Sequence, residues 1–150
     1  MLGNLAKKLR LLGFDSLYSS SIEDDELLLV AKRDNRAIIT KDSLLADKAK
    51  KQGIMTISVT NENEIEQIFQ INEKITLGKC MVGGDTSRCP VCNGELKNIE
   101  KKDVKNKIPS GVIENMNDFW ICEKCNKIYC EGTHIKNLQK FTAELNERLS

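Results

Sequence analysis

This 150-residue sequence lacks a long apolar run, an apolar N-terminal segment and an excess of charge of one sign. No apolar run approaches the roughly 20 residues that a membrane span needs, so we expect no membrane association. The N-terminal residues carry no apolar signal-peptide core, which predicts a cytoplasmic protein. The 23 basic residues are balanced by 22 acidic ones, and the net charge of +1 gives no overall argument for a nucleic-acid partner.

Cysteine is the residue type whose pattern is most informative. Four of the six cysteines form two C-x-x-C pairs, and turn-prone residues follow each pair. The pairs are Cys89 with Cys92 and Cys122 with Cys125. Both thiolates of such a pair can point into one tetrahedral site, so two pairs predict a structural zinc site. Redox dithiols are the weaker alternative, and Cys80 and Cys130 are expected to be small buried apolar residues.

The first half of the sequence alternates between helical and strand patterns. Apolar residues at helical spacing predict helices over 2–12, 24–34, 42–53 and 61–70. Short apolar runs predict strands over 37–40 and 54–59, and residues 14–18 look like a turn into a short strand near residues 17–18. Strands that alternate with helices are typical of parallel βαβ units, so the predicted fold class is α/β with a parallel sheet flanked by helices.

The second half has a different organisation. The periodicity is lost over 72–87, where glycines accumulate, and helical spacing returns over 135–149. We therefore predict an α/β domain over 1–75, a linker over 76–87, and a small four-cysteine zinc ribbon with a C-terminal helix over 88–150.

Acidic residues follow the predicted strands of the first half. Asp42 comes two residues after the strand 37–40, and Asp24 and Asp25 open the helix after the strand near residue 18. Functional groups of parallel α/β sheets gather at the carboxyl ends of the strands, so these carboxylates can converge at one edge. Converging carboxylates bind hard cations such as Mg²⁺ or Mn²⁺, which can activate water and stabilise a phosphoryl transition state. The hydroxyl of Thr40 can add a hydrogen bond at the same edge.

A structural interpretation of the same acids stays open. Acidic side chains are common at helix N-termini, where they cap N–H groups and complement the helix dipole. Asp42 can simply cap the helix that follows it.

Several stretches resemble one known family. Residues 2–15 read LGNLAKKLRLLGFD and resemble its opening L-G-x-L-A-x-x-L-R-x-L-G-[YF]-D. The stretches DDELL (24–28) and ITKD (39–42) resemble its D-D-E-L-L and L-T-[RK]-D motifs. The stretches RCPVCNG (88–94), FWICEKC (119–125) and the ending at 129–134 resemble its ribbon. The family is the Mut-seven C-terminal ribonuclease domain, and the resemblance covers about residues 1–138.

The resemblance implies a PIN-like α/β fold followed by a zinc ribbon. It implies a metal-dependent ribonuclease, a hydrolase of RNA phosphodiester bonds, and RNA as partner. In this sequence Asp24 and Asp42 match acidic positions of the family and would hold Mg²⁺ or Mn²⁺, with Asp25 as a neighbouring catalytic acid. The four paired cysteines match the ligands of a structural Zn²⁺.

One part of the family pattern is missing from this sequence. The family normally begins with a strand that ends in an aspartate just before the Met-Leu-Gly, and this strand is absent. Two hypotheses follow: a truncated ribonuclease, or a catalytically weak or inactive module that binds RNA or protein without cutting.

Basic residues near these motifs are candidate substrate contacts. Arg10 lies inside the opening motif, and a guanidinium binds phosphate in bidentate geometry. Lys41 lies between Thr40 and Asp42, so we predict Arg10, Thr40 and Lys41 as substrate-binding residues. A solvated polar face is the alternative interpretation of the basic residues.

Overall fold

The computed structural model describes residues 2–60, 62–78 and 80–149, apart from the side chains of residues 133, 134 and 149. Its contacts group into two units. The first consists of Met1–Leu5 and Tyr18–Gly78, and the second of Ala6–Leu17 and Lys79–Ser150. Helix α1 (Gly3–Leu11) spans the division. The domain boundaries expected from the sequence stay a prediction.

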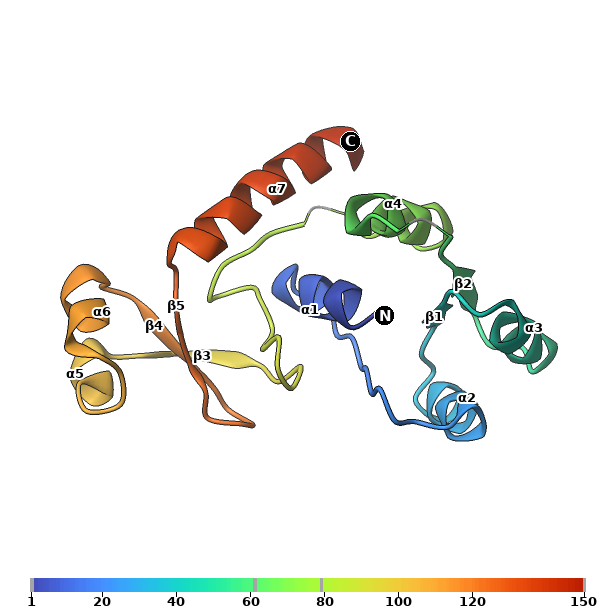
Figure 1. Cartoon of the computed structure of the whole chain (residues 1–150), viewed down its shortest axis with the longest axis horizontal. Coiled ribbons are helices and arrows are strands. Elements are labelled where there is room, and N and C mark those ends of the chain that lie inside the picture. Colours follow the sequence, from blue (N-terminus) through green and yellow to red (C-terminus); the bar gives the residue numbers. More distant parts are fainter. Residues whose placement is uncertain (1, 61, 79, 150) are drawn as a thin grey trace. The chain divides into compact units, whose positions relative to one another are not determined.

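The first unit is built around two parallel strands. Its elements are α2 (Asp24–Arg33), β1 (Ile38–Thr40), α3 (Ser43–Lys51), β2 (Thr56–Ser58) and α4 (Glu64–Lys74). Ile38 pairs with Thr56 and Thr40 with Ser58, in parallel register. Figure 1 shows the three helices arranged around the two strands. The predicted parallel α/β architecture is confirmed.

The core of the first unit comes from the apolar side of each helix. Leu28 and Ala31 of α2, three residues apart, pack with Ile38 of β1 in one buried cluster. Leu45 and Ala49 of α3, four residues apart, complete it together with Ile54. These spacings place both side chains of a helix on one face, which is why short helices can cover so small a sheet.

The short strand predicted near residues 17–18 is wrong. Residues 14–19 carry no strand, and the backbone N–H of Ser16 donates to the side-chain Oδ1 of Asn93 rather than to a neighbouring strand. Leu17 and Tyr18 are 52% and 45% exposed. A segment becomes a strand only when a partner strand pairs its backbone, and none of the strands in the described residues pairs with this segment.

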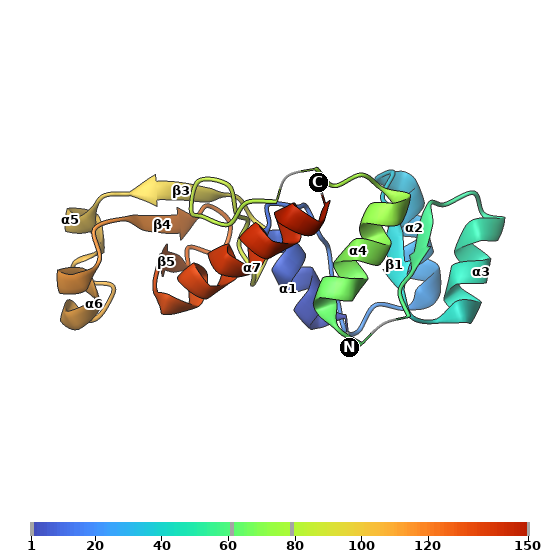
Figure 2. The ribbon, with the colours of Figure 1, turned by 90° about the horizontal axis from the view of Figure 1, so that it is seen from above.

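The second unit contains an antiparallel sheet of three strands in the order β3-β4-β5. The strands are β3 (Leu96–Ile99), β4 (Phe119–Cys122) and β5 (Ile128–Cys130). Two short helices, α5 (Lys101–Val104) and α6 (Ser110–Asn115), connect β3 to β4, and α7 (Thr133–Leu149) follows β5 (Figure 2). The ribbon and the C-terminal helix agree with the sequence prediction, whereas α5 and α6 were not predicted.

The core of the second unit centres on Phe119 and Trp120. Phe119 is fully buried, and the Trp120 indole N–H donates to Asp85 Oδ1 at 3.2 Å. Gly84 lies against the indole, because a Cβ on Gly84 would stand 1.9 Å from ring atoms of Trp120. Only glycine permits this approach of backbone and ring.

The longest helix of the structure, α7, has 17 residues. In the described ranges, none of the helices joins the length and the apolar character that a membrane crossing would need.

Candidate metal centre and acidic edge

The four paired cysteines converge on one point of the second unit. The Sγ atoms of Cys89, Cys92, Cys122 and Cys125 all lie within 4.8 Å of one another. The Cys89–Cys125 sulfur distance is 3.8 Å and the Cys92–Cys122 sulfur distance is 3.3 Å. Four sulfurs at about 2.3 Å from a tetrahedral zinc ion stand about 3.8 Å apart. The cluster therefore matches the size of a structural zinc site.

Each pair is shaped by a tight backbone turn. Asn93 and Asn126, the residues directly after each pair, have φ angles of 69° and 63°. Asparagine tolerates this left-handed conformation better than most residues, which explains its place in both turns. The N–H groups of Lys124 and Cys125 point at Cys122 Sγ, each at 3.4 Å. These amides stabilise a thiolate and hold the sulfur in place.

Gly94 leaves room for the sulfurs. A Cβ at this position would stand 2.8 Å from Cys122 Sγ and 3.2 Å from Cys92 Sγ. A side chain would therefore enter the space that a metal ion and its ligands need. Together with the sulfur distances, this cradle shows that the residues fit a bound Zn²⁺.

The ionisation of the thiols also points to a cation. Burial and the adjacent Cys122 sulfur raise the pKa of Cys92 to about 12. For Cys122, burial disfavours the thiolate, but the N–H groups of Cys125 and Lys124 outweigh it and lower the pKa to about 7. Four neighbouring thiolates repel each other, so a dication is needed to ionise all of them.

Tyr129 of β5 supports one ligand from outside the cluster. Its hydroxyl lies 2.9 Å from Cys89 Sγ. Burial, with the Cys89 sulfur, raises the pKa of Tyr129, so the hydroxyl keeps its proton and can donate a hydrogen bond to the Cys89 thiolate. Such outer partners orient metal ligands and tune their basicity.

A buried arginine fastens the first cysteine turn to helix α1. The Arg10 guanidinium donates from Nη1 to the Pro90 carbonyl at 2.8 Å and from Nε to the Ser16 carbonyl at 2.8 Å. Arg10 is only 7% exposed. The structure thus places this predicted phosphate-binding residue inside the second unit, where its donors face backbone carbonyls, and its role toward substrate stays a prediction.

Asn93 adds a second connection between the same parts. Its Nδ2 donates to Asp15 Oδ1 at 2.6 Å, and its Oδ1 accepts the N–H of Ser16 at 3.0 Å. The backbone N–H of Arg88 donates to the Arg10 carbonyl at 2.8 Å. We call residues 6–17 the strap, because they hold the first cysteine turn from outside. Sequence reasoning missed this role, since nothing local connects residues that are about 80 positions apart.

The two single cysteines stand apart from the cluster. Cys80 is 1% exposed, and burial raises its pKa. Its backbone N–H and carbonyl are both held by the side-chain amide of Asn146 at 2.7 Å. The prediction of a buried apolar residue is confirmed for Cys80, whereas Cys130 is only half-buried.

In the first unit, Asp42 lies at the carboxyl end of β1 and caps helix α3. Its Oδ1 accepts the N–H of Leu44 at 2.9 Å and that of Leu45 at 3.3 Å. The structural interpretation of Asp42 as a cap is therefore correct. The second carboxylate oxygen, Oδ2, makes no hydrogen bond within the part of the chain that the structure describes.

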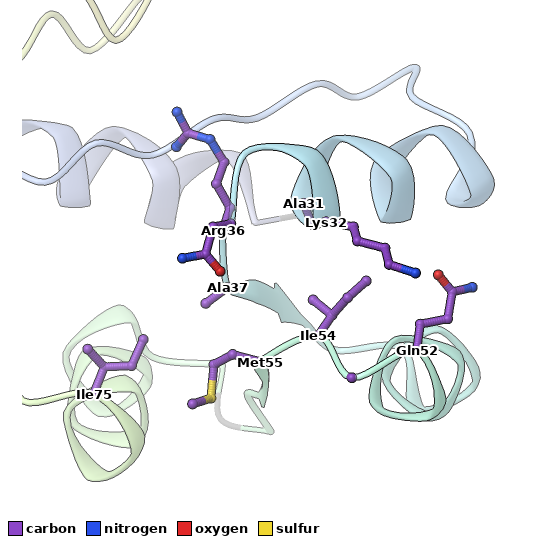
Figure 3. A pocket seen from close by; sticks show the side chains of 10 residues that line it. Ala31, Lys32, Arg36, Ala37, Gln52, Ile54, Met55 and Ile75 are labelled. Carbon is purple, nitrogen blue, oxygen red and sulfur yellow. The ribbon is translucent and has the colours of Figure 1, made fainter.

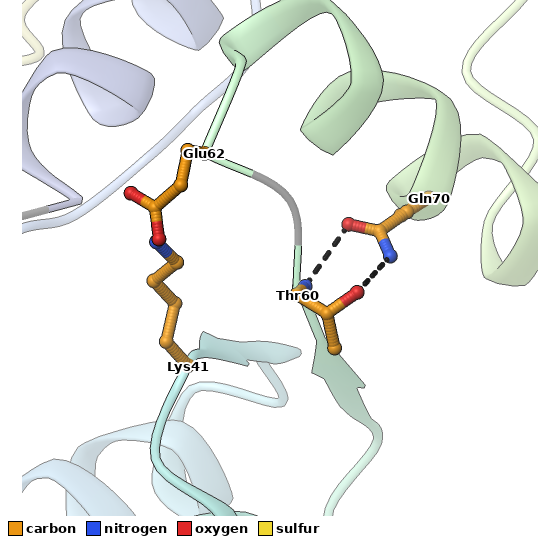
Figure 4. Close-up of polar contacts among 4 residues, drawn as sticks. All are labelled: Lys41, Thr60, Glu62 and Gln70. Atoms are coloured by element: carbon orange, nitrogen blue, oxygen red, sulfur yellow. Dashed lines mark hydrogen bonds and ion pairs between the residues drawn. The ribbon is translucent and has the colours of Figure 1, made fainter.

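Thr40 and Lys41 position the residues around Asp42. The hydroxyl of Thr40, itself buried, accepts the backbone N–H of Asp42 at 3.0 Å. Lys41 Nζ forms an ion pair with Glu62 Oε1 at 2.7 Å (Figure 4). Beside it, Gln70 of α4 holds the end of β2 through the N–H and hydroxyl of Thr60. Both predicted substrate contacts therefore lie at the carboxyl edge of the sheet and have protein partners there.

Asp24 and Asp25 begin helix α2 and line a shallow surface cavity of about 490 Å³. Ser20, Ser21 and Lys48 share this lining. The Nζ of Lys48 makes the cavity attractive to an anion, whereas the two aspartates make it attractive to a cation.

The three aspartates are not gathered into one cluster. Over residues 2–60, 62–78 and 80–149, the four cysteines are the one group of three or more His, Cys, Asp or Glu side chains close enough to share a metal ion. Asp24 and Asp25 are placed by the start of α2, and Asp42 by the start of α3. The side chain of His134, within the family-like ending, lies outside the described residues.

Comparison with protein families gives one match. A family model described as Mut7-C RNAse domain matches residues 1–142, a range that includes both the acidic edge and the four cysteines. Comparison with curated proteins and with solved structures finds no match.

Proposed function

The chain belongs to the Mut7-C RNAse domain family, and we propose that it is a metal-dependent ribonuclease that hydrolyses phosphodiester bonds of RNA. The observation that carries the proposal is the match of a ribonuclease-domain model to residues 1–142. The position of Asp42 supports it, because this carboxylate follows β1 at the carboxyl edge, where parallel α/β proteins bind their ligands.

The proposed reaction centre is the carboxyl edge of the first unit. Asp42 and Asp24 would hold Mg²⁺ or Mn²⁺, which when bound neutralises phosphate charge and increases the acidity of water. Mg²⁺ is usually held by one or two carboxylates together with substrate phosphates, so a third carboxylate within reach is not required. Asp25, beside Asp24, would accept a proton or orient water.

The residues of the chain act on Asp42 in a defined way. The N–H groups of Leu44 and Leu45 occupy Oδ1, which fixes the carboxylate plane and leaves Oδ2 for a cation. The Thr40 hydroxyl holds the backbone at the same residue. Lys41 and Lys48 would attract the RNA phosphates.

The four-cysteine site would act structurally. Bound Zn²⁺ would hold the ribbon together, and the ribbon would help to hold or orient RNA. A four-thiolate site requires reduced cysteines, which supports a reducing compartment such as the cytoplasm.

A second candidate function is favoured by one observation. The three aspartates are not gathered into a cluster among the described residues. A module that binds RNA or a protein without cutting needs no such cluster. This alternative predicts stable RNA complexes, no cleavage products and little response to Mg²⁺.

RNA cleavage by the full chain in Mn²⁺ separates the two functions. We propose Asp42→Asn as the test variant, because asparagine can still accept the capping N–H groups but lacks the negative charge. Asp47→Asn, an exposed residue in the same helix, is the matched control. We expect the cleavage rate to fall at least about 100-fold in Asp42→Asn and to stay unchanged in Asp47→Asn. Equal rates in Asp42→Asn and in the parent chain would exclude the proposed site.

A further inference from the structure

The opposite edge of the same sheet contains a second, unassigned cavity. It has a volume of about 380 Å³ and lies at the amino ends of β1 and β2. Its size is within the range of small-ligand sites in proteins. Figure 3 shows the residues that line it.

The cavity arises from two helix endings of the same type. At the end of α2, Asn35 has a φ of 53° and the N–H of Arg36 donates to the Ala31 carbonyl at 2.8 Å. At the end of α3, Gly53 has a φ of 75° and the N–H of Ile54 donates to the Ala49 carbonyl at 3.0 Å. Such left-handed endings stop a helix and turn the chain sharply into the next strand. The cavity lies between these two turns and Ile75, which follows α4.

One end of the cavity is polar. The side chains of Lys32 and Gln52 extend toward each other there (Figure 3). Within the described ranges, neither the ammonium of Lys32 nor the side-chain amide of Gln52 has a hydrogen-bond or ion-pair partner in the protein. Both groups are therefore available to a ligand. The guanidinium of Arg36 points away from the cavity, so only its stem contributes (Figure 3).

The other wall is apolar although it faces solvent. Ile54 lies at the base, and Met55 and Ile75 stand beside it (Figure 3). Met55 is 54% exposed and Ile75 is 37% exposed. An apolar wall next to an ammonium and an amide suits an anion with a flat, hydrogen-bonding body.

The charge around the cavity favours an anion. Basic residues lie in the last turns of the three helices: Lys32 and Arg33 in α2, Lys50 and Lys51 in α3, and Lys74 in α4. The first turns of α2 and α4, at the other edge, are acidic. Because the helices run against the strands, this gives the amino edge a positive potential.

We propose that this cavity binds one nucleotide of a single-stranded RNA, at a distance from the cleavage edge. The base would lie against Met55 and Ile75 with the Gln52 amide at its polar edge, and Lys32 would contact the phosphate. This inference rests on the proposed ribonuclease function for the identity of the ligand. It adds an anchor at the edge opposite the reaction centre.

Binding of a fluorescein-labelled eight-nucleotide RNA to the full, zinc-loaded chain tests the proposal. The titration is done by fluorescence anisotropy without Mg²⁺ or Mn²⁺, so that binding is measured apart from cleavage. We expect Lys32→Ala to weaken binding about fivefold and to reduce the slope of log affinity against log salt by about 0.7, the value for one phosphate contact. Met55→Ser should weaken binding about threefold without changing this slope, because it removes apolar area only.

Matched controls carry the same chemical change outside the cavity. Lys140→Ala removes a positive charge from the exposed side of α7, and Leu29→Ser removes an exposed apolar side chain from α2. We expect both controls to bind RNA nearly as the parent chain does. Circular dichroism and thermal melting show whether each variant is folded, and all four positions are exposed.

The outcomes separate the anchor from the ribonuclease activity. If Lys32→Ala and Met55→Ser lose no more RNA affinity than their controls, the proposed anchor is overturned, whatever the cleavage rate. The anchor would also be overturned if the two variants lost affinity for free uridine monophosphate or poly-glutamate but kept their affinity for RNA. Specific losses with RNA support it even if Asp42→Asn leaves cleavage unchanged, a result that would refute only the proposed catalytic site.

Discussion

The two candidate metal sites of this protein differ in how their ligands are brought together. The four thiols of the second unit lie within 4.8 Å of one another, and backbone N–H groups already point at one of them. The aspartates of the first unit come from two separate helices, with Asp24 and Asp25 at the start of α2 and Asp42 at the start of α3. Ligands three positions apart in a tight turn converge by local geometry, whereas ligands from separate helices converge only through the packing of those helices and a shared cation. We therefore expect the zinc ligands to be in position before a metal ion binds, whereas the aspartates are not.

The largest expected effect comes from removing one thiol. Cys122→Ser deletes the sulfur that receives two backbone N–H groups, and we expect bound zinc to fall from about one per chain to none. Zinc binding to such sites contributes about 10–16 kcal/mol, so the ribbon should unfold. Zinc content by mass spectrometry and thermal melting measure both effects.

Cys130→Ser is the matched control, because Cys130 lies outside the cluster. It should keep its zinc. Full zinc content in Cys122→Ser would contradict the assignment of this cysteine as a ligand.

The next largest effect concerns the strap. Arg10→Met leaves the Pro90 and Ser16 carbonyls without their charged donors. We expect the free energy of unfolding of the second unit to fall by about 2–4 kcal/mol and zinc to dissociate faster. Denaturant unfolding and zinc transfer to a chromophoric chelator measure these changes. Lys7→Met, on the exposed side of the same helix, should change neither quantity, and equal effects of the two substitutions would show that the strap contacts are unimportant.

A side chain at position 94 should reduce the space available to the four sulfurs and the zinc ion. Gly94→Ala places a Cβ 2.8 Å from Cys122 Sγ, and we expect a cost of about 1–3 kcal/mol with weaker zinc binding. Gly111→Ala provides the control, since a Cβ there meets no atom within 4 Å. Unfolding of zinc-loaded protein compares the two variants. Unchanged zinc affinity in Gly94→Ala would mean that the cradle is more adaptable than the structure indicates.

Substitutions at the acidic edge should change the free energy of unfolding much less. Asp42→Ala removes the cap of α3 and should reduce the free energy of unfolding by about 1 kcal/mol. Asp42→Asn should cost only a few tenths of a kcal/mol, because asparagine is an equally good cap. Urea unfolding of both variants measures the difference. A large loss of unfolding free energy in Asp42→Asn would show that the charge itself stabilises the fold. Slower RNA cleavage by this variant would then no longer be evidence for a catalytic role of Asp42.

The smallest effect is expected for Lys41→Ala. The ion pair with Glu62 joins side chains that are 30% and 91% exposed, so it should contribute less than about 1 kcal/mol. Urea unfolding in low and in high salt measures it, and the difference between the variants should shrink in high salt. A larger, salt-independent loss would indicate that Lys41 has a structural role at the carboxyl edge.

The sequence predicted what local spacing determines. The C-x-x-C pairs and their turns depend on residues within six positions, and helix α3 with its Asp42 cap depends on one turn. The short strand expected near residues 17–18 is absent, because a strand requires a partner strand, which periodicity does not reveal. The place of Arg10 in the strap could not be predicted either, because its acceptor Pro90 is 80 positions away.

The cavity at the amino edge could not be predicted from the sequence either. Asn35 and Gly53 are visible in the sequence as residues that end helices. That the two turns lie side by side, with the side chain of Lys32 extending toward that of Gln52, follows only from the pairing of β1 with β2.

The dependence of the RNA cleavage rate on Mn²⁺ and on bound zinc tests the proposed function most directly. Zinc-loaded protein is assayed with labelled RNA over a range of Mn²⁺ concentrations, and bound zinc is measured in each sample. Cleavage should increase with Mn²⁺ and fall to background without it, while zinc stays at one per chain throughout. Cleavage that is indifferent to Mn²⁺ and proportional to bound zinc would place the chemistry at the cysteine cluster and contradict the account.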